Sequence, residues 1–342
     1  MPAPLLPLSL LLAGALAAAD PVLLVGGYDP AVRAFSLSPD GVLHPLAASP
    51  VGRNPSFLAI TADARTVYAC DEVAPGRVVA CTFDRGDGTL RPLGSASSGG
   101  KGPCFVAIHP GGRWLFTANY GDGRVAALPL AADGAIGEPA SVVEAGANAH
   151  MALPDAAGTV VHVPCKGADR IAICRFDAGG GMLALEAPAA TPPGTGPRHL
   201  VRSADGARAW LAGELSSTVL PLTVAADGSC TLGAPITTLP PGWNGRNTAG
   251  GIVLAGAQLL VSNRGHDSIA MFSLDASGIP RPIGHVGVGR TPRHLAVSPD
   301  GRHVVVACQD ADRIEVLRCG DGRLLPVGGV AVPRPTFVGF VP

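Results

Sequence analysis

Charged residues are scarce in this chain, and lysine is the scarcest of them. Only 15% of the 342 residues are charged, against about 25% in an average soluble protein. Of the 25 basic residues only Lys101 and Lys166 are lysines, which we attribute to genome composition. The formal net charge of −1 excludes a polybasic nucleic-acid surface. A hydrophobic content of 47%, without any block of charge, argues against a disordered chain.

Several catalytic and metal-binding motifs are also missing. The chain has no G-x-S-x-G nucleophile elbow, no G-x-x-x-x-G-K-[ST] phosphate loop and no H-E-x-x-H zinc motif. It has no C-x-x-C pair, which argues against a zinc ribbon or a thioredoxin-like site. Its GDGRV and DAD fragments lack the ligand spacing of a calcium loop. The sequence therefore predicts a function without a metal or a cofactor.

Long hydrophobic runs are confined to the N-terminus. Residues 3–19 are apolar apart from Ser9 and end in Ala17-Ala18-Ala19, just before Asp20. The segment is too short and too rich in proline for a transmembrane helix, but it fits a signal peptide cleaved after Ala19, although no Lys or Arg precedes it. The sequence therefore predicts a periplasmic or secreted protein without a membrane span. A cytoplasmic protein with an N-terminal extension is the alternative.

Eight cysteines in an exported chain invite disulfides. Three of them end similar apolar strands, and a second cysteine follows each at a hairpin distance, in the pairs Cys70/Cys81, Cys165/Cys174 and Cys308/Cys319. Free cysteine is also among the commonest buried small residues. We expect buried thiols, with cross-strand disulfides as the alternative.

An internal repeat decides the fold. A unit of apolar strand, tight turn and second apolar strand starts six times, and a half copy ends the chain, with starts at residues 57, 105, 150, 199, 251, 294 and 337. The first and last starts are 280 residues apart, so the mean period is about 47 residues. Seven units of four short strands are typical of a seven-bladed β-propeller.

The two ends of the chain each supply part of one blade. Pairing the strand at 21–28 with the strand at 337–341 closes the ring and removes an open sheet edge. The sequence thus predicts an all-β fold, with a signal peptide at 1–19 and a single seven-bladed propeller domain at 20–342. A set of separate β-sandwiches would not give seven near-equal periods. We expect a monomer.

Repeat geometry places two sets of residues at one mouth of the central channel. Residues that open the first strand of a repeat meet residues that follow the second strand. The first set is Phe57, Phe105, His150, His199, Gly251, His294 and Phe337, with Arg198 and Arg293 just before two of the histidines. The second set is Tyr120, Lys166, Glu214, Arg264 and Gln309, with Asn263 just before Arg264.

Polar groups of both signs that converge on a concave mouth suit a small anionic ligand. Solvated strand ends are the alternative for any single residue. A metal site of His150, His199 and His294 is geometrically conceivable, but the nearby arginines would oppose a cation.

Specific segments of the chain resemble a known family. They are PRHL (197–200), GELSSTV (213–219), SNRGHDSIAMF (262–272) and PRHLAVSPDG (292–301), and NPSFLAI (54–60), NYGDGRV (119–125) and GADRI (167–171) extend the match over the mature chain. These segments are similar to those of the seven-bladed lactonase family, which includes propeller-type 6-phosphogluconolactonases and fungal muconate-lactonising enzymes. The resemblance implies a site made of His150, Arg198, Glu214 and Arg264.

The chain departs from the family pattern at three places. Asn148 stands where the family has the first His of a PHxH-like motif, and Phe105 stands where a His is common. Gly250-Gly251 replaces a bulkier pair, which we expect to open the pocket there. These changes affect the choice of substrate rather than the core of the site.

The four family residues suit the opening of a lactone. A His or Glu can activate water, and an Arg can stabilise the oxyanion or bind an acidic group of the substrate. We predict a metal-independent lactonase in which His150 and Glu214 share the proton chemistry and Arg198 and Arg264 hold the carbonyl and the anionic group. The residues expected to bind the lactone or anionic sugar derivative are His199, Asn263, Lys166, Arg293, His294, Gln309 and Tyr120.

Two other functions are compatible with the sequence. One is an exported propeller that binds a ligand without catalysis, since fold does not imply function. The other is a cycloisomerase that closes the lactone ring, because the same residues can run the reverse reaction. An exported enzyme would not meet cytosolic 6-phosphogluconolactone, which favours an unphosphorylated sugar lactone or an aromatic-acid lactone.

Overall fold

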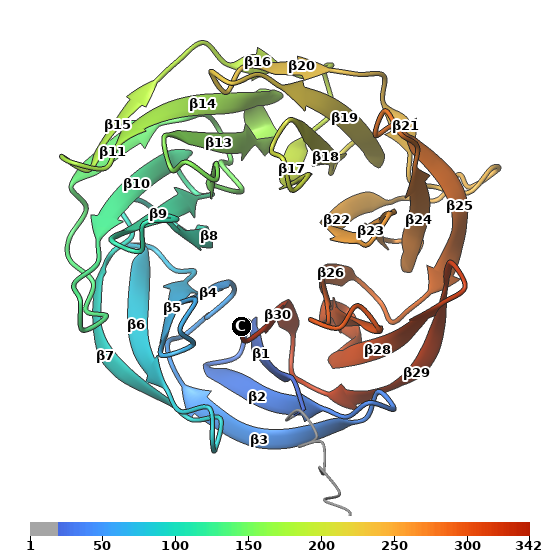
Figure 1. The fold of residues 1–342 in the computed structure, drawn as a ribbon, viewed down its shortest axis with the longest axis horizontal. Coiled ribbons are helices and arrows are strands. Elements are labelled where there is room, and N and C mark those ends of the chain that lie inside the picture. Colours follow the sequence, from blue (N-terminus) through green and yellow to red (C-terminus); the bar gives the residue numbers. More distant parts are fainter. Residues whose placement is uncertain (1–19) are drawn as a thin grey trace, which may run out of the picture.

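The protein is a ring of seven antiparallel sheets around a central channel (Figure 1). The computed structural model describes residues 20–342, so the signal peptide predicted at 1–19 lies outside the described residues. Each sheet is a blade that runs from an inner strand at the channel to an outer strand at the rim. The predicted all-β, seven-bladed propeller is confirmed. No helix in the described part of the chain is long and apolar enough to cross a membrane.

The strands of each blade are given from the channel outward. Blade 1 contains β30 (Pro335–Phe340), β1 (Val22–Gly27), β2 (Ala31–Leu37) and β3 (Leu43–Pro50). Blade 2 contains β4 (Leu58–Ile60), β5 (Thr66–Asp71), β6 (Arg77–Phe83) and β7 (Leu90–Ser97). Blade 3 contains β8 (Pro103–Ile108), β9 (Trp114–Asn119), β10 (Arg124–Pro129) and β11 (Ser141–Glu144).

Blades 4 and 5 differ in having an outer strand broken into two pieces. Blade 4 contains β12 (Leu153–Pro154), β13 (Val160–Cys165), β14 (Arg170–Asp177), β15 (Met182–Leu185) and β16 (Ala189–Ala190). Blade 5 contains β17 (Pro197–Arg202), β18 (Arg208–Gly213), β19 (Thr218–Val224), β20 (Cys230–Leu232) and β21 (Ile236–Thr237).

Blades 6 and 7 again have four strands each. Blade 6 contains β22 (Thr248–Ala255), β23 (Gln258–Arg264), β24 (Ser268–Leu274) and β25 (Pro280–Gly287). Blade 7 contains β26 (Pro292–Val297), β27 (His303–Cys308), β28 (Arg313–Gly320) and β29 (Arg323–Ala331). Two 3₁₀ turns, η1 (Lys166–Ala168) and η2 (Gln309–Ala311), follow β13 and β27.

The two ends of the described chain close the ring in blade 1. Strand β1 pairs antiparallel with β30, with Leu23 opposite Phe340 and Val25 opposite Val338. This confirms the predicted closure by strands from both termini. Because β30 covers the edge of β1, blade 1 is completed to four strands like its neighbours, and the edge of β1 is not left open.

Burial explains why the second strands are continuous apolar runs. Every residue of β5, β13 and β27 is buried, since these strands pack against neighbouring blades on both faces. In the outer strand β7 only Leu90 and Ala96 are buried, and the residues between them are exposed. The hairpin turns between first and second strands need a left-handed residue, supplied by Gly112 at φ 71° and by Ala64 at φ 56°.

All eight cysteines are free thiols, and six of them are buried. The register of the sheets explains why the hairpin pairs are not bridged. In blade 2, Cys70 lies opposite Val78, whereas Cys81 lies opposite Val67. The two cysteines therefore occupy different rungs of the ladder. The prediction of buried free thiols is confirmed for six cysteines, whereas Cys230 and Cys319 are free but only half-buried.

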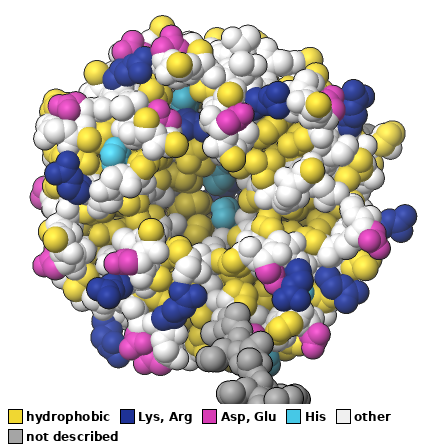
Figure 2. Space-filling view, in the orientation of Figure 1, with side chains coloured by type: hydrophobic (Ala, Val, Ile, Leu, Met, Phe, Trp, Pro, Cys, Tyr) yellow, Lys and Arg dark blue, Asp and Glu magenta, His cyan; other side chains and the backbone are white. Residues whose placement is uncertain are grey.

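The first set of predicted residues meets at the channel axis. The ring of Phe57 lies 4.4 Å from that of Phe105 and 4.6 Å from that of Phe337, measured between centroids. The rings of His150 and His199 are 5.1 Å apart. Figure 2 shows that the centre of the molecule is hollowed and lined mainly by hydrophobic side chains, with histidine at depth. These rings form an aromatic layer in the channel, and the polar residues of the mouth lie above this layer.

Candidate active site

The ends of the second strands form a ring of polar residues at one mouth of the channel. Strand β13 ends at Cys165 and is followed by Lys166, and β18 ends at Gly213 and is followed by Glu214. The same position is occupied in all seven blades, in order by Tyr28, Glu72, Tyr120, Lys166, Glu214, Arg264 and Gln309. Five of these residues were predicted from the sequence, whereas Tyr28 and Glu72 were not. The signal was available, because both directly follow an apolar second strand.

Bulges in the inner strands direct further side chains into the mouth. In blade 5, Pro197 pairs with Gly213 and His199 pairs with Ala212, so Arg198 is an extra residue in the ladder. The same shift occurs at Cys104 in blade 3 and at Arg293 in blade 7. A bulge commonly re-aims a side chain next to an active site. These bulges explain why Arg198, Cys104 and Arg293, which directly precede residues of the aromatic layer in the sequence, belong to the polar ring above that layer.

Aspartate side chains hold the loops around this mouth through hydrogen bonds from backbone N–H groups. The Asp71 carboxylate accepts hydrogen bonds from the backbone N–H groups of Arg53 and Asn54, both at 2.9 Å. In blade 4, Asp169 accepts from the N–H groups of Gly194 and Gly196 at 2.7 and 2.8 Å. The inter-blade loops are therefore held in place, which favours a pocket formed before a ligand binds.

A pocket of about 220 Å³ lies where these side chains converge. The volume is below the range of about 300–1,000 Å³ that is usual for drug-sized ligands, so it suits one small molecule. Its lining consists of Tyr28, Glu72, Cys104, Tyr120, His150, Lys166, Glu214, Arg264 and Arg293. The pocket thus brings together the predicted His150, Lys166, Glu214, Arg264, Arg293 and Tyr120.

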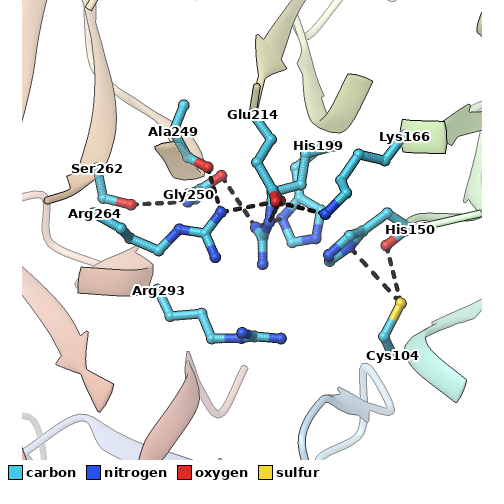
Figure 3. Close-up of polar contacts among 12 residues, drawn as sticks. Cys104, His150, Lys166, His199, Glu214, Ala249, Gly250, Ser262, Arg264 and Arg293 are labelled. Carbon is cyan, nitrogen blue, oxygen red and sulfur yellow. Dashed lines mark hydrogen bonds and ion pairs between the residues drawn. The ribbon is translucent and has the colours of Figure 1, made fainter. Parts of the chain in front are cut away.

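Glu214 holds three cations from three blades (Figure 3). Its Oε1 accepts a hydrogen bond from Lys166 Nζ at 2.8 Å. Its Oε2 lies 3.1 Å from Arg198 Nε and 3.0 Å from Arg264 NH2. The carboxylate is the common counter-ion of a cluster that spans blades 4, 5 and 6.

Backbone carbonyls of blade 6 complete this cluster. Arg264 NH2 donates to the carbonyl of Ala249 at 2.8 Å, and Arg198 NH1 donates to that of Gly250 at 3.0 Å. Both guanidinium groups are therefore anchored on the same strand, β22. Arg264 Nε is buried and makes no hydrogen bond of good geometry to a described residue.

The charge cluster sets the protonation state of Glu214. Burial alone would raise the pKa of this carboxyl, but Arg198 and Arg264 outweigh burial and hold the pKa well below 4.5. Burial lowers the pKa of Arg198 to about 9, which leaves its guanidinium protonated at pH 7. A carboxylate this firmly ionised is a weak proton acceptor. The geometry therefore favours an electrostatic role for Glu214 over the general-base role expected from the sequence.

His150 forms the wall of the pocket between Cys104 and Tyr120. Its Nδ1 lies 3.7 Å from Cys104 Sγ, and its ring packs edge-on against Tyr120 at 5.6 Å between centroids. Burial, reinforced by Arg198, lowers the pKa of His150 well below 6.5. The imidazole is neutral at pH 7 and is available as a hydrogen-bonding group.

The opposite wall is a chain of polar contacts that sequence analysis did not identify. Arg293 NH2 donates to the Tyr28 hydroxyl at 2.9 Å, and that hydroxyl donates to Glu72 Oε1 at 3.2 Å. Burial raises the pKa of Tyr28 to about 12 and also raises the pKa of Glu72 above 4.5. Arg293 NH1 donates to Gln309 Oε1 at 3.3 Å, so Gln309 positions Arg293 from outside the pocket lining.

Besides Gln309, three predicted ligand-binding residues do not line the pocket. Asn263 is fully buried on the other side of its strand, where it bonds the Thr238 hydroxyl and carbonyl, both at 2.7 Å. His199 Nδ1 faces Arg198 NH1 at 3.2 Å, and His294 Nδ1 accepts the Val338 N–H at 3.4 Å. These two histidines belong to the aromatic layer beneath the pocket.

Comparison with known proteins places this architecture in a family. The sequence profile of the seven-bladed β-propeller lactonases matches residues 22–340. The chain belongs to this lactonase family. It is accordingly a lactonase, an enzyme that hydrolyses a lactone.

The lactonase is similar to two curated relatives and to one solved structure. It is 28% identical over 308 residues to the 6-phosphogluconolactonase of Erwinia tasmaniensis, covering 88% of this chain and 92% of that protein. It is 29% identical over 311 residues to the 6-phosphogluconolactonase of Pectobacterium atrosepticum, with 88% and 92% covered. The structure of a periplasmic gluconolactonase from Pseudomonas aeruginosa superimposes with a TM-score of 0.88 at 30% identity, covering 94% and 99% of the two chains.

The departures of this lactonase from the family pattern have structural explanations. A Cβ on Gly250 would lie 2.8 Å from the Pro292 carbonyl oxygen, and one on Gly251 would lie 2.7 Å from a Leu295 side-chain carbon. The neighbouring strand β26 therefore fills the space beside the glycines. The expectation that Gly250-Gly251 opens the pocket is wrong. Asn148 adopts a left-handed turn at φ 54° and donates to the Tyr120 carbonyl at 3.1 Å.

A larger cavity of about 720 Å³ lies at the opposite end of blades 4 and 5, beside the turns at 155–157 and 203–207. Its carboxylates are engaged with those turns, since Asp155 accepts the N–H groups of Thr159 and Val160 at 2.8 and 3.0 Å. Among residues 20–342 no cluster of three His, Cys, Asp or Glu side chains is arranged to hold a metal ion. The pocket at the polar mouth is therefore the candidate active site.

Proposed function

We propose that the lactonase hydrolyses the lactone of a sugar acid in the 220 Å³ pocket at the polar mouth. One observation carries this proposal. Arg198, Arg264 and Lys166 converge on Glu214 from one side, while Arg293 approaches from the other side (Figure 3). Four cations against the carboxylates Glu214 and Glu72 leave a surplus of positive charge, which suits a reaction that creates an oxyanion.

Arg264 is the best-placed group to bind that oxyanion. Its NH2 is fixed by Glu214 and the Ala249 carbonyl, which leaves other N–H groups free of described partners. A donor that is already oriented needs no reorganisation when charge develops on the carbonyl oxygen. Lys166 and Arg293 stand beside the same space and are proposed to bind the hydroxyl groups or the acidic group of the substrate.

Glu214 and His150 have supporting roles in this proposal. Glu214 holds the three cations around its carboxylate, each within hydrogen-bonding distance of one of its oxygens, despite their mutual repulsion. Neutral His150 offers a ring nitrogen to a hydroxyl of the substrate or to the attacking water. Arg198, which is buried and bonded to Glu214 and Gly250, positions the cluster from beneath.

The relatives suggest the substrate class. Those matched by sequence are named 6-phosphogluconolactonases, and the similar structure is a periplasmic gluconolactonase. We propose export of this lactonase, with cleavage after Ala19, and an unphosphorylated sugar lactone as the substrate. Mass spectrometry of the protein from its natural host tests the cleavage. Retention of residues 1–19 on cytoplasmic protein would favour the phosphorylated lactone instead.

Hydrolysis of a lactone panel tests the proposed activity. Glucono-δ-lactone, 6-phosphogluconolactone and an aromatic-acid lactone are followed by pH-stat, with the spontaneous rate subtracted. We expect Arg264→Lys to lower kcat/KM for every lactone that the wild type opens, and more for an acidic one, because lysine lacks the bidentate fork. Arg124→Lys, at an exposed ion pair with Glu144, is the matched control. A wild-type protein that accelerates none of these reactions would refute the proposal.

A further inference from the structure

The polar mouth contains a second carboxylate, Glu72, which neither the family motifs nor the comparisons assign to the reaction. We infer that Glu72 is the general base that activates the hydrolytic water, an inference that rests on the proposed lactone hydrolysis. Glu72 follows strand β5 as Glu214 follows β18, so it occupies the equivalent position three blades away. Both carboxylates line the same pocket.

Glu72 is held in place by one hydrogen-bonded chain. The Tyr28 hydroxyl donates to Oε1 and in turn accepts a hydrogen bond from Arg293 NH2. The guanidinium of Arg293 also stacks over the Tyr28 ring, 5.4 Å from its centroid. These contacts fix the carboxylate without placing a cation directly on it, in contrast to Glu214.

The second oxygen of Glu72 lacks a bonded partner. Oε2 is buried and accepts no hydrogen bond of good geometry. The Ser56 hydroxyl, which also lacks a partner of good geometry, lies close enough to Glu72 to lower the pKa of its carboxyl, although burial outweighs this effect. A buried acceptor without a donor is costly, and buried polar atoms in native proteins are normally satisfied by protein or ordered water. Because Glu72 lines the pocket, its incompletely used acceptor capacity suits a hydrogen bond from a water molecule or a substrate hydroxyl.

The two carboxylates of the pocket are tuned in opposite directions. Burial raises the pKa of Glu72, whereas three cations hold Glu214 ionised. Pairs of acidic groups that differ in this way mark the division between proton transfer and electrostatic stabilisation. A base works best when its pKa lies near the working pH, and of these two carboxylates Glu72 is the one shifted toward neutrality. Buried His150 is shifted away from it.

The reaction balances with Glu72 as the only proton carrier. The carboxylate takes a proton from water while the water oxygen bonds to the lactone carbonyl carbon, and the carbonyl electron pair moves onto the oxygen facing Arg264. When this electron pair returns, the bond between that carbon and the ring oxygen breaks. Glu72 gives its proton to the departing ring oxygen, which becomes the hydroxyl of the hydroxy acid. The carboxylate is regenerated, and no oxidant or metal takes part.

The groups around Glu72 determine the expected pH dependence. Tyr28 after β1, Arg293 on β26, Arg198 on β17 and Cys104 on β8 all act on it. Burial raises the pKa of both Tyr28 and Cys104, so neither of these two groups titrates in the acidic range. The activity should fall as the pH drops through the Glu72 pKa, which lies above 4.5.

Kinetics of Glu72→Gln on a lactone that the wild type opens test this inference. Glutamine keeps the size and can accept the Tyr28 hydrogen bond, but it cannot take a proton. We expect kcat to fall by about 10²-fold or more, KM to change little, and the acidic limb of the pH profile to disappear. Glu315→Gln is the control, because Glu315 is also a partly buried carboxylate but belongs to blade 7, where it pairs with Arg313 outside the pocket lining.

A second variant covers the case in which Glu72→Gln does not fold. Glu72→Ala leaves space for a small acid, so added formate should restore part of the rate if a carboxylate is needed as a base. Full activity and an intact acidic limb in Glu72→Gln would overturn the assignment, as would the lack of any formate rescue in folded Glu72→Ala. If the wild type opens no lactone, it is the proposed function that fails, and the two failures are thereby distinguished.

Discussion

The Glu214 carboxylate shows how one residue can organise the charges of a site. It is the direct ionic partner of Lys166, Arg198 and Arg264, and its side chain is only 8% exposed. Three cations this close would repel one another strongly in a poorly hydrated pocket. The surplus of positive charge proposed to bind an oxyanion is therefore tolerated because one carboxylate compensates part of it.

We expect Glu214→Gln to destabilise the fold as well as the activity. Removing one partner of a buried ion pair leaves an uncompensated charge and costs about 3–5 kcal/mol. Urea unfolding at pH 7 measures this loss. Glu186→Gln is the control, because Glu186 and its partner Arg175 are about half exposed, and such surface pairs contribute about 0–1 kcal/mol.

The destabilisation by Glu214→Gln should depend on pH in one direction. The folded-state pKa of Glu214 lies below 4.5, so the ionised carboxylate contributes stability that is present above about pH 4.5 and lost as the pH falls through the folded pKa. The difference in unfolding free energy between wild type and variant should therefore shrink below pH 4.5. A difference that stays constant from pH 7 to pH 3 would contradict this role.

At the scale of strands, the repeat predicted most of the site, because the end of a second strand lies at the mouth in every blade. It placed Lys166, Glu214 and Arg264 together in the pocket correctly. It missed Glu72, because the strand was taken to end at Cys70, whereas β5 continues to Asp71. It missed Tyr28 because blade 1 is divided between the two ends of the chain.

Other features of the site depend on contacts between blades and are not encoded in a local pattern. Asn263 and Arg264 are neighbours in sequence, yet side chains alternate along a strand, so only Arg264 faces the pocket. The bulge that brings Arg198 to Glu214 is visible only in the pairing of β17 with β18. The depressed pKa of Glu214 follows from rotamers that three different blades supply.

The close packing of the glycine pair of β22 leads to a further prediction at the scale of strands. A methyl group on Gly250 would meet the Pro292 carbonyl oxygen at 2.8 Å and the Ser262 hydroxyl at 2.5 Å. We expect Gly250→Ala to lower the free energy of unfolding by about 1–3 kcal/mol, as overpacking does. It should also lower kcat, because the Gly250 carbonyl anchors Arg198.

Gly287→Ala is the matched control for this substitution. Gly287 ends β25 in the same blade, and an added Cβ there has no atom within 4 Å. Thermal unfolding and lactone kinetics should both remain close to wild type in the control. Equal behaviour of the two variants would mean that the approach of β22 to β26 is not restrictive.

For the whole molecule, closure of the ring makes the two distant ends of the chain mutually dependent. The core is divided into six apolar clusters between blades, so every blade needs both neighbours to bury its faces. Phe337 of β30 belongs to the cluster it shares with blade 2, and Val338 belongs to the cluster it shares with blade 7. Loss of β30 would therefore affect both sides of blade 1 and also the aromatic layer beneath the pocket.

We expect a protein lacking residues 337–342 to lose soluble, cooperative folding. The deletion removes the strand opposite Leu23 to Gly26 and exposes the edge of β1, which invites aggregation. It also removes the Phe337 ring that packs on Phe57 and His294. Soluble yield, circular dichroism and a thermal transition are compared with a variant lacking only Pro342, which is exposed and lies beyond β30. If the protein lacking residues 337–342 unfolds at the wild-type temperature, the ring does not need its terminal strand. Six intact blades and the remainder of blade 1 would then be sufficient for the fold.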